Sequence, residues 1–70
     1  MTNKEIIKII KERKSILGIN QESLAELSEV GLATLKRFES GKGNLTLSNF
    51  RKIIDVLGLE INIEIKKPNK

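Results

Sequence analysis

The 70-residue sequence contains no cysteine, histidine, tryptophan or tyrosine, and it has a single proline. Without cysteine the chain forms no disulfide, and its compartment cannot be deduced from redox chemistry. The absence of cysteine and histidine removes the common ligands of zinc and copper, so we expect no metal site and no cofactor. It also removes the side chains that most often act as general base or nucleophile near neutral pH, which argues against an enzyme.

Long apolar runs are also missing. Residues 1–5 lead into a mixture of isoleucine and charged side chains, with no stretch long enough to cross a membrane. We therefore expect neither a signal peptide nor a membrane span, which favours a cytoplasmic protein. A chain of this length forms one small domain that buries only about 60% of its unfolded surface. Its stability is expected to be marginal unless a second copy completes the fold.

Charge is plentiful, with 13 lysine and arginine residues against 9 aspartate and glutamate residues and a net charge of +4. A basic protein suits a polyanionic partner. The charges are unevenly distributed, because residues 1–20 carry five basic and two acidic side chains whereas residues 21–43 carry three basic and four acidic ones. Charge alone therefore does not identify the binding surface.

Two stretches have the period and the end signals of longer helices. The first starts with a capping box at Thr2, carries isoleucines at spacings of three and four, and stops at Gly18. The second starts at Thr46 and repeats apolar residues in the same way as far as Gly58. Both stretches are predicted to be amphipathic helices.

Two shorter helices are predicted between them. Asn20 caps the first, and the second runs from about Leu32 to Ser40. Two short helices joined by a tight turn form the helix-turn-helix arrangement, in which the second helix enters the major groove of DNA. The alternative is an ordinary helical hairpin at the surface. Five apolar side chains are expected to anchor the pair to the core: Leu24, Leu27, Val30, Leu35 and Phe38.

The hydrophobic period changes to two near the C-terminus. Apolar and polar residues alternate over residues 59–66, which predicts a strand. A single strand has no partner in an otherwise helical chain, so we expect it to pair with its own copy across a two-fold axis. Residues 67–70 are expected to form a flexible tail after a DNA-binding domain over residues 1–58. The expected dimerisation residues are Leu59, Ile61, Ile63 and Ile65.

These features belong to one longer pattern. The run INQESLAELSEVGLATLKRFESGKGNLTLSNFRKIIDVLGLEI resembles the XRE, or lambda-repressor-like, helix-turn-helix family, and in particular short regulators similar to the HipB antitoxin. The resemblance covers about residues 10–61. It implies an all-α, four-helix lambda-repressor-like domain that binds a palindromic operator in double-stranded DNA as a homodimer and represses transcription. A toxin protein would be a further partner.

The resemblance also assigns contacts by position. It implies base-edge contacts from Leu32, Ala33, Lys36 and Arg37. It implies contacts to DNA phosphates from Gln21, Thr34, Ser40, Lys42 and Asn44. It further implies an ion pair between Glu39 and Lys14, which stands where the family usually has arginine. Because lysine lacks the bidentate fork, this pair should be weaker than the family's.

Three positions depart from the family pattern. Glu29 stands where glycine is common in the turn, so a left-handed backbone there would cost roughly 1 kcal/mol. Gly31 replaces the usual serine cap of the second short helix. Leu45 replaces a proline in the loop that follows. The first two departures affect the geometry of the helix that would read DNA.

Other functions have less support in the sequence. The helically spaced Glu22, Glu26 and Glu29 form no catalytic set, because no nucleophile, phosphate loop or metal ligands accompany them. An outward Leu32 allows a protein contact in place of a DNA contact. We therefore predict a DNA-binding repressor, in its most specific form the autoregulatory antitoxin of a toxin–antitoxin operon. The alternative is a protein-interaction module that mainly binds and neutralises a partner protein.

Overall fold

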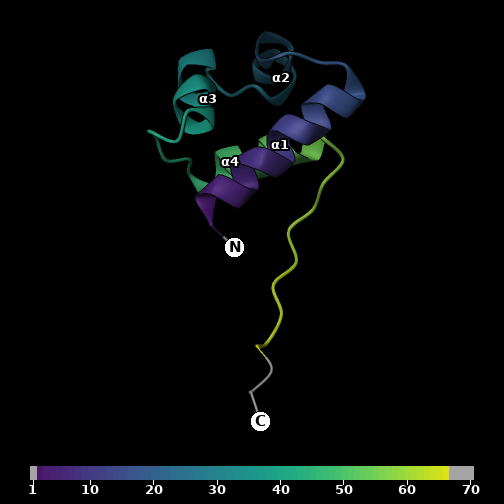
Figure 1. Ribbon diagram of the computed structural model, residues 1–70, viewed down its shortest axis with the longest axis vertical. Coiled ribbons are helices and arrows are strands. Elements are labelled where there is room, and N and C mark those ends of the chain that lie inside the picture. Colours follow the sequence, from purple (N-terminus) through teal and green to yellow (C-terminus); the bar gives the residue numbers. More distant parts are fainter. Residues whose placement is uncertain (1, 67–70) are drawn as a thin grey trace.

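The computed structural model describes residues 2–66, which form four helices and no sheet (Figure 1). The predicted all-α, four-helix domain is confirmed. The short helices α2 and α3 pack side by side, and α2 also packs against α4. The helices are α1 (Asn3–Leu17), α2 (Gln21–Ser28), α3 (Leu32–Glu39) and α4 (Leu47–Val56).

Local side chains set the starts of three helices, as predicted. The Thr2 hydroxyl accepts a hydrogen bond from the Glu5 backbone N–H at 3.2 Å, and the Glu5 carboxylate accepts one from the Thr2 backbone N–H at 2.9 Å. The Thr2 backbone N–H, and after it the Thr2 hydroxyl, hold the pKa of the Glu5 carboxyl below its usual value. The side chains of Asn20 and Thr46 each accept one hydrogen bond, from the backbone N–H of Ser23 and Asn49, at the starts of α2 and α4. These caps satisfy N–H groups that have no partner inside the helix.

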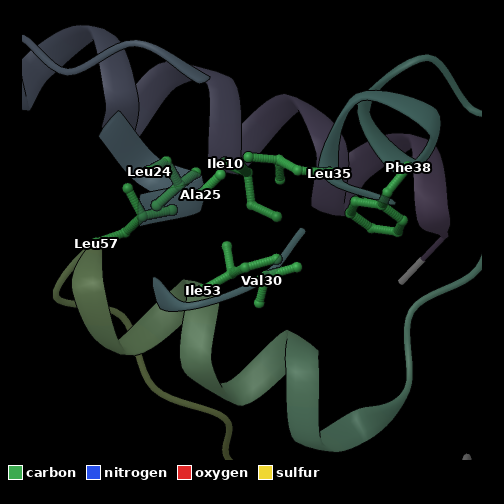
Figure 2. Close-up of a cluster of buried hydrophobic side chains, with 8 residues drawn as sticks. All are labelled: Ile10, Leu24, Ala25, Val30, Leu35, Phe38, Ile53 and Leu57. Atoms are coloured by element: carbon green, nitrogen blue, oxygen red, sulfur yellow. The ribbon is translucent and has the colours of Figure 1, made fainter. Parts of the chain in front are cut away.

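Side chains from all four helices meet in one core (Figure 2). Four of the five predicted anchors of the short helices are buried there, but Leu27 is 60% exposed. The buried stripe of α2 runs through Leu24, Ala25 and Ser28, which turns Leu27 outward. The prediction for Leu27 was therefore wrong. The buried core consists of Ile10, Leu24, Ala25, Val30, Leu35, Phe38, Ile53 and Leu57.

Arg13 ties α1 to the end of α4. Its Nε and Nη2 atoms donate to the Leu57 carbonyl oxygen at 3.1 and 3.0 Å. This carbonyl stands at the C-cap of α4 and has no partner within the helix. Gly58 follows with φ +72°, and a Cβ there would lie 3.3 Å from Arg13 Nη2. Glycine thus allows the left-handed turn and leaves room for the guanidinium group.

Residues 59–66 form no strand in the single chain, and their predicted pairing with a second copy stays a prediction. Leu59 packs against the core, but Ile63 and Ile65 are 92% and 96% exposed. The reason is that a strand requires a neighbour to pair its backbone groups, and the described residues of one chain provide none. Figure 1 shows this segment leaving the helices as an extended trace. The predicted tail, residues 67–70, lies outside the described residues.

Candidate nucleic-acid interface

The two short helices and their turn form the unit that the sequence predicts. α2 and α3 are eight residues each, and buried side chains on both hold them to the core. Burial of Leu35 and Phe38 fixes the inner face of α3, so its opposite face is presented to solvent. On that face Ala33, Lys36 and Arg37 are exposed. The arrangement gives α3 one free, basic face.

Leu32 differs from the other predicted base contacts. It is only partly exposed, and it packs against the hydrophobic core at the start of α3. Part of its side chain therefore holds the helix in place, and the remainder is open to a partner. Thr34, one of the predicted phosphate contacts, is exposed on the same helix.

The turn contains a strained residue. Glu29 has φ 60° and ψ 30°, and it is the one non-glycine residue with positive φ between residues 2 and 66. The sequence leaves the backbone conformation of Glu29 open, and the structure places it in the left-handed region. Its backbone N–H and that of Val30 donate to carbonyls near the end of α2, at Glu26 and Ala25. The chain therefore reverses direction at the cost of placing a Cβ in the left-handed region.

Three hydrogen bonds hold the loop after α3 to a single carbonyl oxygen. The backbone N–H groups of Lys42 and Gly43 donate to the Arg37 carbonyl at 3.0 and 3.2 Å, and the Ser40 hydroxyl donates to it at 2.8 Å. A Cβ at Gly43 would lie 3.1 Å from Arg37 Cβ, so the loop packs tightly on α3. Lys42 and Asn44 are exposed on this loop. Their positions are thus fixed relative to the free face of α3.

A buried ion pair joins α1 to α3, and a hydrogen bond connects α2 to the same carboxylate. Lys14 Nζ lies 2.6 Å from Glu39 Oε1, and the two side chains are only 12% and 3% exposed. The predicted pair is confirmed, but it is buried, so its loss should matter more than the loss of a surface pair. Gln21 Nε2 also donates to Glu39 Oε1, at 3.3 Å. The predicted phosphate contact Gln21 therefore already has a partner within the protein.

One atom of this cluster lacks a partner. Glu39 Oε2 is buried without a hydrogen bond. A lysine presents a compact charge to one carboxylate oxygen, whereas an arginine fork serves both. Lys14 thus leaves one oxygen of the Glu39 carboxylate without a partner.

The sequence that forms this helix pair matches the model of a known protein family. A family model described as Helix-turn-helix matches residues 9–63, which include all of α2, α3 and α4. The chain belongs to the XRE-type helix-turn-helix family. The members of this family are DNA-binding regulators and are typically not enzymes. No curated protein matches the chain.

The start of α3, the helix proposed to read DNA and called the reading helix below, has no side-chain cap. Gly31 occupies the N-cap position of α3 with φ −56° and ψ 137°, and it makes no side-chain hydrogen bond there. A Cβ at this position would meet Thr34 Oγ1 at 3.7 Å, an ordinary contact. The fold therefore does not require a glycine at position 31.

The described residues, 2–66, also bear on other kinds of site. Within that range no three or more aspartate, glutamate, cysteine or histidine side chains are grouped so that they could hold a metal ion. None of the helices in the described part of the chain has the length and apolar character needed to cross a membrane.

Replacing Glu29 with glycine should raise the melting temperature. Relief of the Cβ penalty, roughly 1–2 kcal/mol, exceeds the entropic cost of a new glycine, about 0.5–1 kcal/mol. For a domain of this size the largest net gain, about 1.5 kcal/mol, corresponds to a rise of about 6–12 °C, measured by circular dichroism. Glu29→Ala keeps the Cβ and is the control, with no rise expected. A lower melting temperature for Glu29→Gly would contradict the assignment of strain to this residue.

Proposed function

We propose that the protein is a sequence-specific transcriptional repressor that binds a palindromic operator as a homodimer. The observation that carries the proposal is the free face of α3, with a loop fixed to its end through the Arg37 carbonyl. A rigid helix with basic side chains suits the major groove, and an adjoining loop suits the phosphate backbone. The proposed base contacts are Leu32, Ala33, Lys36 and Arg37. The proposed phosphate contacts are Gln21, Thr34, Ser40, Lys42 and Asn44.

The side chains on α3 suggest how a base sequence would be read. Lys36 and Arg37 are able to donate to guanine, whereas Ala33 and the open part of Leu32 offer only apolar contact to thymine methyl groups. Direct reading of base edges is therefore modest. Sequence-dependent DNA shape would supply part of the specificity.

Arg37→Ala and Lys42→Ala should weaken DNA binding in different ways. If Arg37 reads a base, its loss costs about 1–3 kcal/mol, and only when the operator carries the matching base at one position. Lys42 is proposed to contact a phosphate, so its loss should weaken binding to all sequences about equally and reduce the salt slope by about one contact. Each variant serves as the control for the other.

The measurement is a fluorescence titration with DNA from upstream of the protein's own gene. Base-pair variants of that DNA and a series of salt concentrations separate the two effects. Unchanged operator affinity in both variants would exclude α3 and its loop as the binding surface.

The homodimer is supported by residues 59–66. Ile63 and Ile65 are almost fully exposed, and a pair of strands from two copies would cover them. An antiparallel register with Ile63 opposite its own copy sets Glu60 against Lys66 and avoids placing Glu60 opposite Glu64. Such a dimer would set two reading helices about 34–36 Å apart, the distance of one DNA turn.

The more specific proposal is that the protein is the autoregulatory antitoxin of a toxin–antitoxin operon. It is supported by the resemblance to short HipB-like regulators and by apolar side chains left open outside α3. Ile16 is 71% exposed and Leu27 is 60% exposed, which gives a protein partner apolar contacts. A pulldown with the product of the neighbouring gene and a gel shift on the protein's own promoter test it together. A shift without a partner indicates a plain repressor, and a partner without a shift indicates a protein-interaction module.

A further inference from the structure

Two lysines of α1 lie beside the end of the reading helix. Lys4 and Lys11 are about two helical turns apart, which places them on the same side of α1. Both line a shallow depression together with Ser40 and Gly41, where α3 ends and its loop begins. Ile7 lies between them along the helix and is partly buried. The basic side of α1 thus adjoins the surface proposed to contact DNA.

A second depression makes the same connection at the start of α1. Asn3 borders it from α1, and Asn44 and Leu45 border it from the loop after α3. Asn44 and Lys42 are proposed phosphate contacts on that loop. The first turn of α1 is therefore next to a segment that would follow the DNA backbone.

The charges near these lysines leave them free to bind an anion. Lys14–Glu39 is the one ion pair among residues 2–66, so Lys4 and Lys11 are paired with no described residue. Glu39, the carboxylate that borders the same depression, is already neutralised by Lys14. Glu5 and Glu12 do not line this depression; they line a neighbouring one on α1, where three lysines outnumber the two glutamates: Lys4, Lys8 and Lys11. The depression is net positive.

We propose that Lys4 and Lys11 bind backbone phosphates of DNA that flanks the bases facing α3. α1 would then be a third phosphate-binding element, in addition to the start of α2 and the loop after α3. The inference rests on the proposed function, because it requires α3 to lie in a DNA groove. It extends the contact surface to a helix for which the sequence predicts only a structural role.

The test compares two doubly substituted proteins that have lost the same charge. Lys4→Gln/Lys11→Gln removes the proposed contacts, and Arg51→Gln/Lys52→Gln removes two exposed cationic side chains of α4 that do not line the depression. Each full-length protein is titrated with a labelled random-sequence DNA duplex over a series of salt concentrations. Each lost phosphate contact lowers the slope of log affinity against log salt by about 0.9. We expect a fall of about 1.8 for the first protein and little change for the control.

The outcomes separate this inference from the proposed function. A wild-type slope in the Lys4→Gln/Lys11→Gln protein, or an equal fall in both proteins, overturns the role of α1 and leaves DNA binding intact. A wild-type chain that does not bind the duplex even at low salt overturns both. If the double substitution abolishes the helical circular dichroism, Lys4→Gln and Lys11→Gln are measured singly, each with an expected fall of about 0.9.

Discussion

Replacing Lys14 with methionine should unfold a large fraction of the protein, whereas replacing Glu39 with glutamine should be tolerated much better. The Glu39 side chain is 3% exposed, and the Lys14 ammonium 2.6 Å away is its one charged partner. Removing one member of a buried pair typically costs about 3–5 kcal/mol, because the other charge stays buried without compensation. That is most of the stability expected of so small a domain, about 5 kcal/mol.

The two variants differ in stability because the residue that remains unpaired is different in each. A glutamine at position 39 keeps the shape of the carboxylate and still accepts hydrogen bonds from Lys14 and Gln21. The longer lysine side chain is also able to turn its ammonium group to water. Urea denaturation followed by circular dichroism measures both variants, and Lys14→Met/Glu39→Gln should recover part of the lost stability. A Lys14→Met protein as stable as Glu39→Gln would show that the carboxylate is not held by the pair.

Lys14→Arg is the informative conservative change. A guanidinium fork is able to donate to both carboxylate oxygens, and Glu39 Oε2 now has no partner. We therefore expect this variant to be more stable than the wild type.

Removing residues 59–70 should convert the proposed dimer to a monomer and reduce operator affinity by roughly a hundredfold or more. Two linked reading helices gain avidity of about 10²–10⁴ over one, and the gain disappears with the link. Sedimentation reports the oligomeric state, and titration with operator DNA reports the affinity. A truncated protein that still sediments as a dimer would show that the helices form the interface.

Truncation also removes Leu59, which packs against the core and whose backbone N–H donates to the Ile54 carbonyl at 2.9 Å. A gentler variant avoids this loss. Ile63→Asp/Ile65→Asp changes two side chains that are almost fully exposed in the single chain, so the helical domain should keep its stability. It should nevertheless be monomeric, because like charges would meet across the strand pair. Ile16→Asp, an exposed isoleucine on α1, is the matched control and should remain a dimer.

The parts of the fold that the sequence predicts are those with a local cause. Thr2, Asn20 and Thr46 each cap a helix through a bond to a backbone group three residues away, and such spacings are visible in the sequence. The partner of Lys14 was predictable only through the resemblance to the family. The resemblance also marked Glu29 as a position where glycine is usual, but only the structure shows that its backbone is left-handed.

The parts that could not be predicted depend on contacts to backbone carbonyl oxygens. Arg13 donates to the Leu57 carbonyl, and the loop after α3 is anchored on the Arg37 carbonyl. Every residue has a carbonyl oxygen, so neither contact leaves a signature in residue types. Leu27 was misplaced because a helix of eight residues has room for more than one apolar stripe. The alternation over residues 59–66 specifies a period but not the chain that would complete a sheet.

The bond between Arg13 and the Leu57 carbonyl bears on when the protein becomes functional during its synthesis. The two residues are 44 positions apart, and the core also requires Ile53 from the last helix. A growing chain that ends before these residues lacks one wall of its core, and small cores tolerate little loss. α3 therefore emerges from the ribosome before the residues that complete the core have been synthesised. A prematurely terminated product that stops between residues 40 and 52 would contain every residue of α3 but lack Ile53 and Leu57 of the core, so it should be unable to present that helix.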